Sequence, residues 1–427
     1  MDAAKGGAGR VWLDVTTTSH AGARHDGTTR IERGLIRELP ALLSERLGFC
    51  VYDRTFRHFS AVDRPSLPDV FVATRPAKRR GRGPIGNAGR KVEKAFRGLI
   101  KGAAAEVVST ADRFRERRLF PEAGAGDVLL LAGENWGRHD FGILRELKRR
   151  QGIRIAAVLQ DMVPSVHPQF FDDEHFMARF QDYVDFLAND ADVVLVISQC
   201  TRNDFLKAAP GADPAKIVQI SLGADFKAAR ERQRPEGLPG LAGKPFVLSV
   251  STIQVRKNFD LLYRLWQKFA IEGGKGEPHL VIVGREGFGS ADLMHLMRND
   301  PWIAKTVTVL NRASDAELAW LYANAAFTLY PSWYEGWGLP LSESLAYGKT
   351  FIASDTSSLP EAGQGLGIHL SPYDLVAWER EVLRLSNDAE ARAAMERRIV
   401  AERRLPNWAD CARDVARAIG QVTAVAG

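Results

Sequence analysis

Two carboxylates flank a glycine-rich stretch near the middle of the second half of the chain, in the run Glu335-Gly336-Trp337-Gly338-Leu339-Pro340-Leu341-Ser342-Glu343. Gly336 and Gly338 allow tight backbone geometry, and Pro340 favours the first turn of a helix. Because a helix N-terminus carries free N–H groups and a positive dipole end, this loop is predicted to bind a diphosphate. Glu335 and Glu343 are predicted to accept hydrogen bonds from hydroxyl groups at the two ends of a nucleotide sugar. The alternative is a loop before an amphipathic helix, with both carboxylates solvated.

Two adjacent cations, Arg256 and Lys257, follow an apolar run at Phe246–Val250 and precede a helical pattern. Cations at the end of a strand suit a diphosphate whose negative charge rises as a glycosidic bond breaks. We therefore predict that both stabilise a leaving group, and that Asn258 caps the following helix. A solvated basic turn is the alternative.

Short apolar runs alternate with helical patterns along most of the chain. One such pattern is the apolar face formed by Ile31, Leu35, Ile36 and Leu39. The alternation predicts two doubly wound α/β domains with parallel sheets, facing each other across a cleft. The predicted strands are residues 11–15, 49–52, 127–131, 155–159, 193–197, 217–220, 246–250, 280–283, 307–310, 327–330, 350–353 and 368–370.

The length of 427 residues also favours two domains. We predict an N-terminal domain at 1–222 with a basic insertion at about 60–125, a Pro- and Gly-containing linker at 223–240, and a second domain at 241–405. The last stretch, 406–427, is predicted as a helix, and it resembles the segment that returns to the N-terminal domain in proteins with two Rossmann-like domains.

The run from Tyr330 to Glu343 resembles the E-x7-E signature of the retaining family 4 glycosyltransferases. The run from Ser249 to Asn258 is similar to the G-T-L-x-P-R-K-N block of that family, with Ser251 and Val255 in place of Gly and Pro. Other blocks match in order and leave only residues about 60–125 outside the resemblance. They include Val281 to Gly287, and Gln160 to Pro164, in which Gln160 stands where the family has a histidine.

The resemblance implies a GT-B fold of two Rossmann-like domains, with the donor held by the second domain and the acceptor presented by the first. Gly27 allows close backbone approach, and Thr28 or Thr29 can offer a hydroxyl group, although a plain turn into a helix is an alternative there. The role of Asp161 stays open between orienting the acceptor hydroxyl and organising its loop. The predicted catalytic residues are Arg256, Lys257, Glu335 and Asp161; the donor-binding residues are Thr252, Gly284, Arg285, Gly336, Trp337, Gly338, Leu339 and Glu343; and Gly27, Thr28 and Thr29 form an acceptor or phosphate loop.

The activity implied is a retaining, metal-independent transfer of a sugar from a GDP- or UDP-linked donor to a hydroxyl of a glycan or lipid-linked glycan. No cofactor besides the nucleotide sugar is expected. The resemblance favours bacterial mannosyl- or rhamnosyl-type transferases of surface polysaccharide synthesis. Two alternatives stay open: a nucleotide-sugar epimerase or hydrolase on the same scaffold, and a non-catalytic nucleotide-sugar-binding protein.

Charge is distributed unevenly. The chain has a net charge of +6, but residues 51–120 hold 17 Lys and Arg against 7 Asp and Glu. Residues 75–101 have the pattern of a helix on an anionic membrane surface, with a helix packed on its own domain as the alternative. No nucleic-acid reader motif accompanies the charge.

Without an apolar run long enough to cross a bilayer or a readable leader, a cytoplasmic protein, peripheral on the inner face of the membrane, is expected. Cys50, Cys200 and Cys411 share no metal-ligand spacing and are expected to be free thiols.

Overall fold

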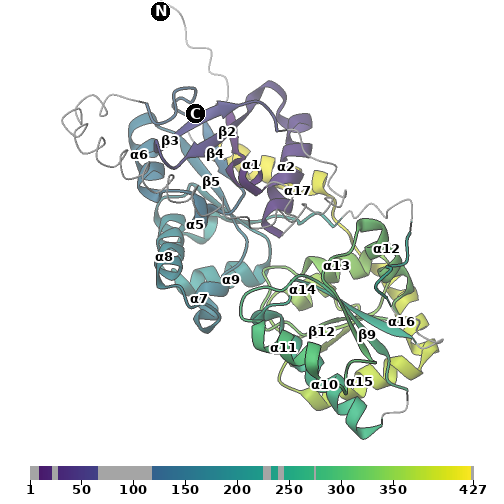
Figure 1. Ribbon diagram of the computed structural model, residues 1–427. Coiled ribbons are helices and arrows are strands. Elements are labelled where there is room, and N and C mark those ends of the chain that lie inside the picture. Colours follow the sequence, from purple (N-terminus) through teal and green to yellow (C-terminus); the bar gives the residue numbers. More distant parts are fainter. Residues whose placement is uncertain are drawn as a thin grey trace, which may run out of the picture.

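The structure is a computed structural model that describes residues 9–21, 27–65, 118–224, 232–238, 245–273 and 276–424. Its helices and strands form two lobes (Figure 1), the first drawn in purple to teal and the second in green to yellow. Most of the predicted basic insertion, including residues 75–101, lies outside the described residues. Within the described ranges, no helix is long and apolar enough to cross a membrane.

The first lobe contains a sheet in the order β3-β2-β1-β4-β5-β6-β7. Its neighbours pair in parallel except β2 and β3. Each of the six predicted runs forms a strand, and the antiparallel β3 was not predicted. The strands are β1 (Val11–Asp14), β2 (Leu47–Asp53), β3 (His58–Val62), β4 (Val128–Leu131), β5 (Arg154–Leu159), β6 (Val193–Val196) and β7 (Ile217–Gln219).

Helices cover both faces of this sheet because each has one apolar side. On α2 the predicted face of Ile31, Leu35, Ile36 and Leu39 is buried against the sheet. Polar residues begin other helices: Asp140 accepts the Ile143 N–H at the start of α6, and Ser198 accepts the Thr201 N–H at the start of α9. The helices are α1 (Thr16–Ala21), α2 (Gly27–Leu43), α5 (Asn135–Arg138), α6 (Phe141–Gln151), α7 (Val163–Val166), α8 (Glu174–Asn189) and α9 (Gln199–Ala208), with short 3-10 turns at Ser44–Arg46, Pro168–Phe170 and Pro214–Lys216.

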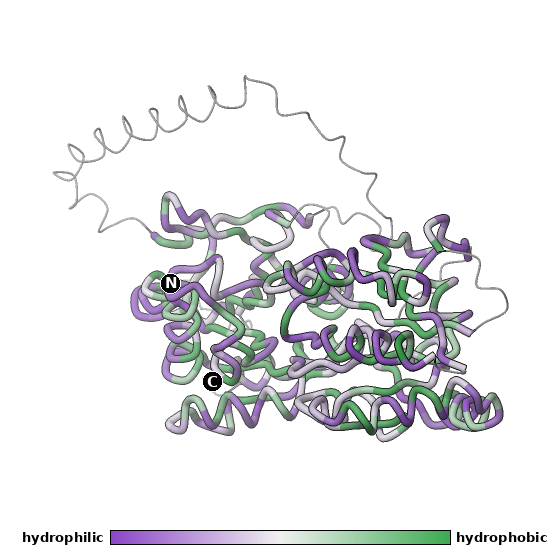
Figure 2. Tube along the Cα trace, turned by 60° about the horizontal axis from the view of Figure 1, so that its bottom comes forward, coloured by the Kyte–Doolittle hydropathy of each residue, from purple (hydrophilic) through white to green (hydrophobic). Residues whose placement is uncertain are grey.

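The second lobe contains a parallel sheet in the order β10-β9-β8-β11-β12-β13. All six predicted runs form strands, so the predicted doubly wound α/β class is confirmed in both lobes. They are β8 (Phe246–Val250), β9 (His279–Val283), β10 (Val307–Leu310), β11 (Thr328–Tyr330), β12 (Phe351–Ser354) and β13 (Ile368–Leu370). The helices are α10 (Phe259–Glu272), α11 (Ala291–Asn299), α12 (Asp315–Asn324), α13 (Leu339–Ala346), α14 (Leu359–Gly363), α15 (Leu375–Asn387) and α16 (Ala389–Glu402), with a 3-10 turn η5 (Val255–Lys257) after β8. Figure 2 shows green and purple alternating along the helices, as expected of elements with one apolar and one polar face.

The last helix, α17 (Trp408–Ala424), crosses back to the first lobe, where it lies beside α2 (Figure 1). Trp408, Cys411 and Val415 join the core formed by β1, β4 and α2. The Trp408 ring fills the space over two glycines, since a Cβ would lie 2.2 Å from it at Gly34 and 2.4 Å at Gly223. α17 is therefore an integral helix of the first lobe.

Two chain crossings join the lobes side by side. The Ala224 N–H donates to the carbonyl of Pro406 at 2.7 Å. The segment that leaves the first lobe is thus hydrogen-bonded to the segment that returns to it. Part of the predicted linker is described: residues 232–238 pack on the second lobe, where Leu238 is buried and the Gln233 N–H donates to Ala316 O. These residues belong to the second lobe and not to a free connector.

The carboxyl ends of the parallel strands face the space between the lobes, which is where α/β sheets bind ligands. Direct contacts cross this space. Arg30 Nη1 lies 2.9 Å from Glu343 Oε1, the Tyr334 hydroxyl donates to Asp204 Oδ2 at 2.8 Å, and the Gln199 N–H donates to Glu361 at 2.9 Å.

Candidate active site

The candidate site is built on the loops that follow β8 and β11. Arg256 and Lys257 lie in the η5 turn after β8, and Glu335 lies in the loop after β11. β8 and β11 are neighbours in the sheet, so their carboxyl ends lie together. The Trp333 N–H donates to the Arg256 carbonyl at 2.9 Å and ties the two loops to each other.

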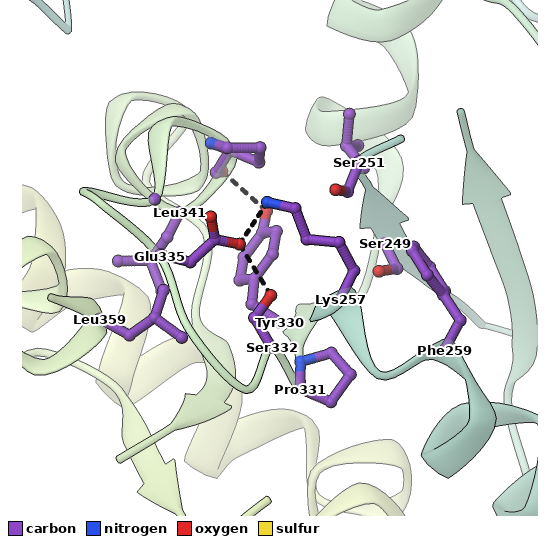
Figure 3. Close-up of a pocket in the computed structure, with 13 residues that line it drawn as sticks. Ser249, Ser251, Lys257, Phe259, Tyr330, Pro331, Ser332, Glu335, Leu341 and Leu359 are labelled. Carbon is purple, nitrogen blue, oxygen red and sulfur yellow. Dashed lines mark hydrogen bonds and ion pairs between the residues drawn. The ribbon is translucent and has the colours of Figure 1, made fainter. Parts of the chain in front are cut away.

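Glu335 is the centre of this cluster, with both carboxylate oxygens engaged. Lys257 Nζ donates to Oε1, Arg256 Nη1 donates to Oε2 at 2.8 Å, and the Ser332 hydroxyl donates to Oε1 at 2.8 Å. Figure 3 shows Lys257 and Ser332 converging on Glu335 between the two loops. Arg256 also donates to the Tyr334 carbonyl at 2.9 Å. The predicted cations and carboxylate thus form one buried cluster.

The cluster changes the acidity of its members. Burial alone would raise the pKa of Glu335, but the Lys257 and Arg256 cations outweigh it and lower that pKa to about 2. Burial, helped by the positive charge of Arg256, lowers the pKa of Lys257 to about 8. Burial also lowers the pKa of Arg256, but the carboxylates of Glu335 and Asp161 raise it more. At neutral pH Arg256 and Lys257 are protonated and Glu335 is ionised, so within the second lobe two cations share one carboxylate.

A small void of about 10 Å³ lies against Lys257, Glu335 and Gly338. That volume holds at most one water molecule, because a water needs about 10 to 15 Å³. Lys257 fills the space by reaching Glu335.

The glycine-rich loop opens α13 as predicted. Gly338 is the residue before the helix and has φ +109°, a conformation that L side chains rarely adopt, and Pro340 lies in the first turn. Gly348 has φ +68° and lies just beyond the end of this helix. The Ser358 hydroxyl lies 2.9 Å from the Glu335 carbonyl and 2.8 Å from the Trp337 carbonyl. These contacts hold the loop in place.

Trp337 and Leu339 lie where the lobes meet. Both contact the apolar core of the first lobe, and the Trp337 indole N–H donates to the Ser342 hydroxyl at 2.9 Å. Gly336 touches the first lobe directly, because a Cβ there would lie 2.2 Å from the Gln160 carbonyl and 2.9 Å from the Asp161 side chain. Close packing of the lobes therefore accounts for the residue types at Gly336, Trp337 and Leu339, whether or not they also contact a ligand.

Glu343 lies on α13 and is buried, so the alternative of two solvated carboxylates is wrong for both residues. Its Oε1 pairs with Arg30 at 2.9 Å, and its Oε2 accepts the Tyr322 hydroxyl at 2.7 Å. Arg30 directly follows the predicted loop of Gly27, Thr28 and Thr29, which forms the first turn of α2. A Cβ at Gly27 would lie 3.9 Å from Leu339, so this loop faces the start of α13.

The first lobe adds Asp161 to the cluster. Asp161 follows β5, its Oδ1 accepts the Val163 N–H at 3.1 Å, and its charge acts on Arg256 and Lys257. Burial raises the pKa of Asp161, against the lowering effect of Arg256. Gln160, in contrast, turns away and donates to the carbonyls of Ala132 and Gly133 at 3.3 and 3.4 Å.

The remaining predicted donor residues lie on the β8 and β9 loops. Gly284 lies against the Ser251 carbonyl, where a Cβ would approach to 1.8 Å, so only glycine fits between these loops. Thr252 is partly buried beside it, and Arg285 has an exposed side chain while its carbonyl accepts the Ile253 N–H. In the part of the chain that the structure describes, neither residue is hydrogen-bonded to Lys257 or Glu335.

One capping prediction needs correction. Asn258 precedes α10 as predicted, but its side chain makes no cap hydrogen bond and instead donates to the Pro372 carbonyl at 3.4 Å. The left-handed backbone of Asn258, with φ +54°, makes the turn into the helix. Ser314 and Glu317 form a capping box at the start of α12.

Sequence reasoning missed several supporting residues: Arg30, Asp204, Ser332, Ser357 and Ser358. Ser357 accepts the Glu335 N–H at 2.9 Å. Arg30 could have been found from its place beside the Gly-Thr-Thr loop, whereas the serines carry no sequence signal. The described residues contain no group of three or more His, Cys, Asp or Glu arranged to hold a metal ion, and Cys50, Cys200 and Cys411 are free.

Comparison with known proteins gives a family match that covers the second lobe. The profile of the family described as "Glycosyl transferases group 1" matches residues 232–400. The O-antigen chain mannosyltransferase B of Escherichia coli is 27% identical over 232 residues, which are 52% of this chain and 59% of that protein. The aligned segment thus spans less than two thirds of that relative's length.

Solved structures match across nearly the whole chain. Sucrose-phosphate synthase of Thermosynechococcus elongatus has a TM-score of 0.61 at 20% identity and covers 98% of this chain and 100% of its own. HepE of Anabaena, solved in complex with UDP, has a TM-score of 0.59 at 14% identity and covers 97% and 100% of the two chains. At these identities the likeness shows the fold, and the predicted GT-B fold is confirmed. The chain therefore has a GT-B fold, and its residues 232–400 are similar to the group 1 glycosyl transferases.

Proposed function

We propose that the protein transfers a sugar from a nucleoside diphosphate donor to a hydroxyl of a glycan or lipid-linked glycan, with retention of configuration and without a metal ion. The observation that carries the proposal is the buried cluster of Arg256, Lys257 and Glu335 at the start of α13, with Asp161 added from the opposite lobe. The group 1 profile and the mannosyltransferase relative do not favour an epimerase or a non-catalytic binder.

In the proposed mechanism Arg256 and Lys257 grip the diphosphate. The positive end of α13, opened by Gly336 and Gly338, faces the same anion. As the glycosidic bond breaks, negative charge grows on the leaving phosphate, and preorganised cations stabilise that charge most in the transition state. Two protein cations supply the charge that a metal ion supplies in other sites, which supports metal independence.

The state of Glu335 bears on the route by which configuration would be retained. A carboxylate with a pKa of about 2, bound by two cations, is a poor nucleophile, so a covalent glycosyl intermediate on Glu335 is disfavoured. A front-face substitution, in which the leaving phosphate oxygen helps to take the acceptor proton, needs no such intermediate. Glu335 then holds the cations in place and accepts donor hydroxyls through its remaining lone pairs.

The other predicted residues receive roles on the same basis. Glu343 is proposed to bind the ribose hydroxyls, in exchange for its contact with Arg30. Thr252, Gly284 and Arg285 are proposed to border the nucleotide base, and Gly27 to Thr29 to face the acceptor. The mannosyltransferase relative supports GDP-mannose as the first donor to try, with UDP-sugars next. A lipid-linked acceptor would place the protein at the inner face of a membrane.

The test is a donor panel of GDP- and UDP-sugars, assayed for nucleoside diphosphate release with and without lipid-linked acceptors. Acceptor-dependent release with an α-configured product from an α-linked donor is expected, and EDTA should leave the rate unchanged. Acceptor-independent donor conversion would indicate an epimerase or hydrolase. A strict Mg²⁺ requirement would contradict the metal-free part of the proposal, and inverted product the retaining part.

A further inference from the structure

A second pocket lies between the lobes, beside the candidate active site but lined by different residues. It has a volume of about 560 Å³ and is enclosed by α7 and α9 on one side and by the loops after β11, β12 and β13 on the other. That volume is within the range of ordinary small-ligand sites. None of its lining residues borders the small void at Lys257.

The pocket shares a wall with the Glu335 loop. Tyr334 lines the pocket, and its carbonyl accepts the hydrogen bond from Arg256 at 2.9 Å. Ser357 also lines the pocket, and its hydroxyl accepts the Glu335 N–H at 2.9 Å. A ligand in the pocket would therefore lie one residue away from the group that holds the two cations.

An aromatic platform forms one side of the pocket. The rings of Trp333 and Tyr373 are 4.5 Å apart between centroids, at 50° to each other. Tyr373 is 80% exposed, so this ring contributes little to the core of the second lobe. Trp333 is half-buried and Tyr373 is exposed, so the two rings offer apolar area with little conformational freedom to lose, which suits the apolar C–H face of a pyranose ring.

Hydrogen-bonding groups surround the platform. The Asp204 carboxylate accepts the Tyr334 hydroxyl at 2.8 Å, and Glu361 accepts the Gln199 N–H at 2.9 Å. A carboxylate has about four acceptor sites, so each keeps capacity for the vicinal hydroxyls of a sugar. Two carboxylates disfavour a second diphosphate here, even though Lys207 lies 3.1 Å from Asp204. The chemistry therefore favours a neutral polyol over an anion.

We propose that this pocket binds a sugar unit of the acceptor glycan, stacked on Trp333 and Tyr373, and thereby selects a saccharide acceptor over a simple alcohol. The proposal rests on the proposed glycosyltransferase function. It adds a subsite formed by both lobes, so an acceptor chain in the pocket would also hold the lobes together.

Tyr373→Ala tests the platform with little risk to folding, because the side chain is exposed. Tyr373→Phe keeps the ring and removes only the hydroxyl. Trp302→Ala is the matched control, since Trp302 is 54% exposed and precedes β10. It therefore lies at the amino ends of the strands, whereas the carboxyl ends face the cleft. The probes are mannotriose, maltotriose and chitotriose, measured by calorimetry and by saturation-transfer NMR on the full chain, with GDP and UDP titrated in parallel.

The wild type is expected to bind at least one trisaccharide, and Tyr373→Ala to weaken that binding by about tenfold or more. Tyr373→Phe and Trp302→Ala should bind within about twofold of the wild type, and the affinity for GDP or UDP should not change in any variant. Failure of the wild type to bind any of the three probes, or wild-type affinity in Tyr373→Ala, would overturn the subsite.

The two proposals can fail separately. If the trisaccharide binds in a Tyr373-dependent way but no nucleotide sugar is turned over, the proposed function is wrong and the saccharide pocket stands. If transfer occurs and Tyr373→Ala keeps the wild-type acceptor KM, the function stands and the pocket assignment is wrong.

Discussion

Glu335 prepares the site for an anion it does not itself bind. Its ion pairs with Lys257 and Arg256 already order two long cationic side chains. A diphosphate that binds would therefore not bear the entropic cost of ordering them. When the diphosphate enters, the cations gain a second partner beside Glu335. In the proposed mechanism these ion pairs are the resting arrangement of a diphosphate clamp.

The acidity of Lys257 predicts how the rate depends on pH. Its pKa is lowered from 10.5 to about 8 by burial and by Arg256, so the ammonium group loses its proton as pH rises through about 8. We expect kcat/KM for the donor to fall above that pH, by about tenfold for each further unit, because this parameter reports the free enzyme. Initial rates of nucleoside diphosphate release between pH 6 and 10 measure the profile.

Lys257→Arg is the control for this profile, since an arginine stays protonated across the range. The variant should be slower at neutral pH, because the guanidinium does not fit the small void, but its rate should not fall near pH 8. A profile with the same descending limb in Lys257→Arg would assign the titration to another group.

Much of the candidate site could be predicted from sequence, since residues within one loop keep their spacing when the chain folds. Arg256 and Lys257 were predicted to stabilise a leaving group and Glu335 to accept donor hydroxyls, and both cations lie within hydrogen-bonding distance of Glu335. The pairing of Arg30 with Glu343 could not be predicted, because it joins residues 313 positions apart on different lobes. The roles of the Ser332 and Ser358 hydroxyls could not be predicted either, because serine is common in loops of every kind.

At the scale of elements, α13 depends on a backbone conformation that only glycine adopts without cost. Gly338→Ala would place a Cβ 2.8 Å from Leu359 at a φ of +109°. We expect a loss of roughly 1 to 3 kcal/mol in unfolding free energy, together with weaker binding of nucleoside diphosphate, as the start of α13 shifts. Urea melts and GDP or UDP titration measure the two effects.

Gly365→Ala is the matched control, because Gly365 also has a positive φ, of +67°, but faces open space. It should lower stability by about 1 kcal/mol or less and leave nucleotide binding unchanged. If both substitutions changed nucleotide affinity equally, the Gly338 conformation would have no specific role in nucleotide binding.

The docking of α17 gives a second prediction at this scale. Trp408→Ala removes the ring that packs on Gly34 and Gly223, and should cost about 3 to 5 kcal/mol. Trp302→Ala, at an exposed tryptophan, should cost less than about 0.5 kcal/mol. Hydrogen exchange of α17 and α2 amides locates the effect, and loss of protection elsewhere but not in these helices would contradict the packing account.

The elements themselves were largely predictable because buried parallel strands have continuous apolar runs with strong β preference. All twelve predicted strands are present, with ends shifted by one or two residues. β3 was missed because its pattern is weak: of His58–Val62 only Phe59 is buried, and the strand lies on the sheet edge. The docking side of α17 was expected only by resemblance, since an amphipathic helix does not specify which sheet it covers.

At the scale of the whole molecule, a buried acid in the first lobe links stability to pH. Glu32 on α2 is fully buried, and its Oε1 accepts the Thr18 N–H at 2.5 Å. Asp14 and His139, 3.1 Å apart, face the same interior. Burial and the charge of Asp14 raise the pKa of Glu32 from 4.5 to about 8, so the folded lobe keeps a proton that the unfolded chain releases.

The stability that Glu32 contributes is therefore full below pH 4.5 and is lost as pH rises to about 8. Glu32→Gln keeps the acceptor for Thr18 without an ionisable proton. At pH 8 we expect the variant to be more stable than the wild type by roughly 2 to 4 kcal/mol, and the difference to shrink toward pH 5. Urea melts across this range measure it, and a difference that does not vary with pH would show that Glu32 is not the linked group.

Polar contacts join the two lobes. Their residues in the second lobe lie in the same cluster of loops as the proposed diphosphate clamp. Arg30 reaches Glu343, Asp204 accepts from Tyr334, and Gly336 touches Gln160. Donor binding in the second lobe and acceptor binding in the first are thus expected to favour the same closed arrangement, because each ligand lies against residues from both sides.

The central claim is that Lys257 and Arg256, held by Glu335, stabilise a departing diphosphate, and its most direct test is the rate of Lys257→Ala with the donor that the panel identifies. Lys349→Ala is the matched control, as Lys349 pairs with Glu396 and precedes β12, at the edge of the sheet opposite the cleft. Acceptor-dependent nucleoside diphosphate release should fall by about 10²- to 10³-fold in Lys257→Ala, with the folded state retained by circular dichroism, and stay near wild type in Lys349→Ala. A wild-type rate in Lys257→Ala would contradict the account.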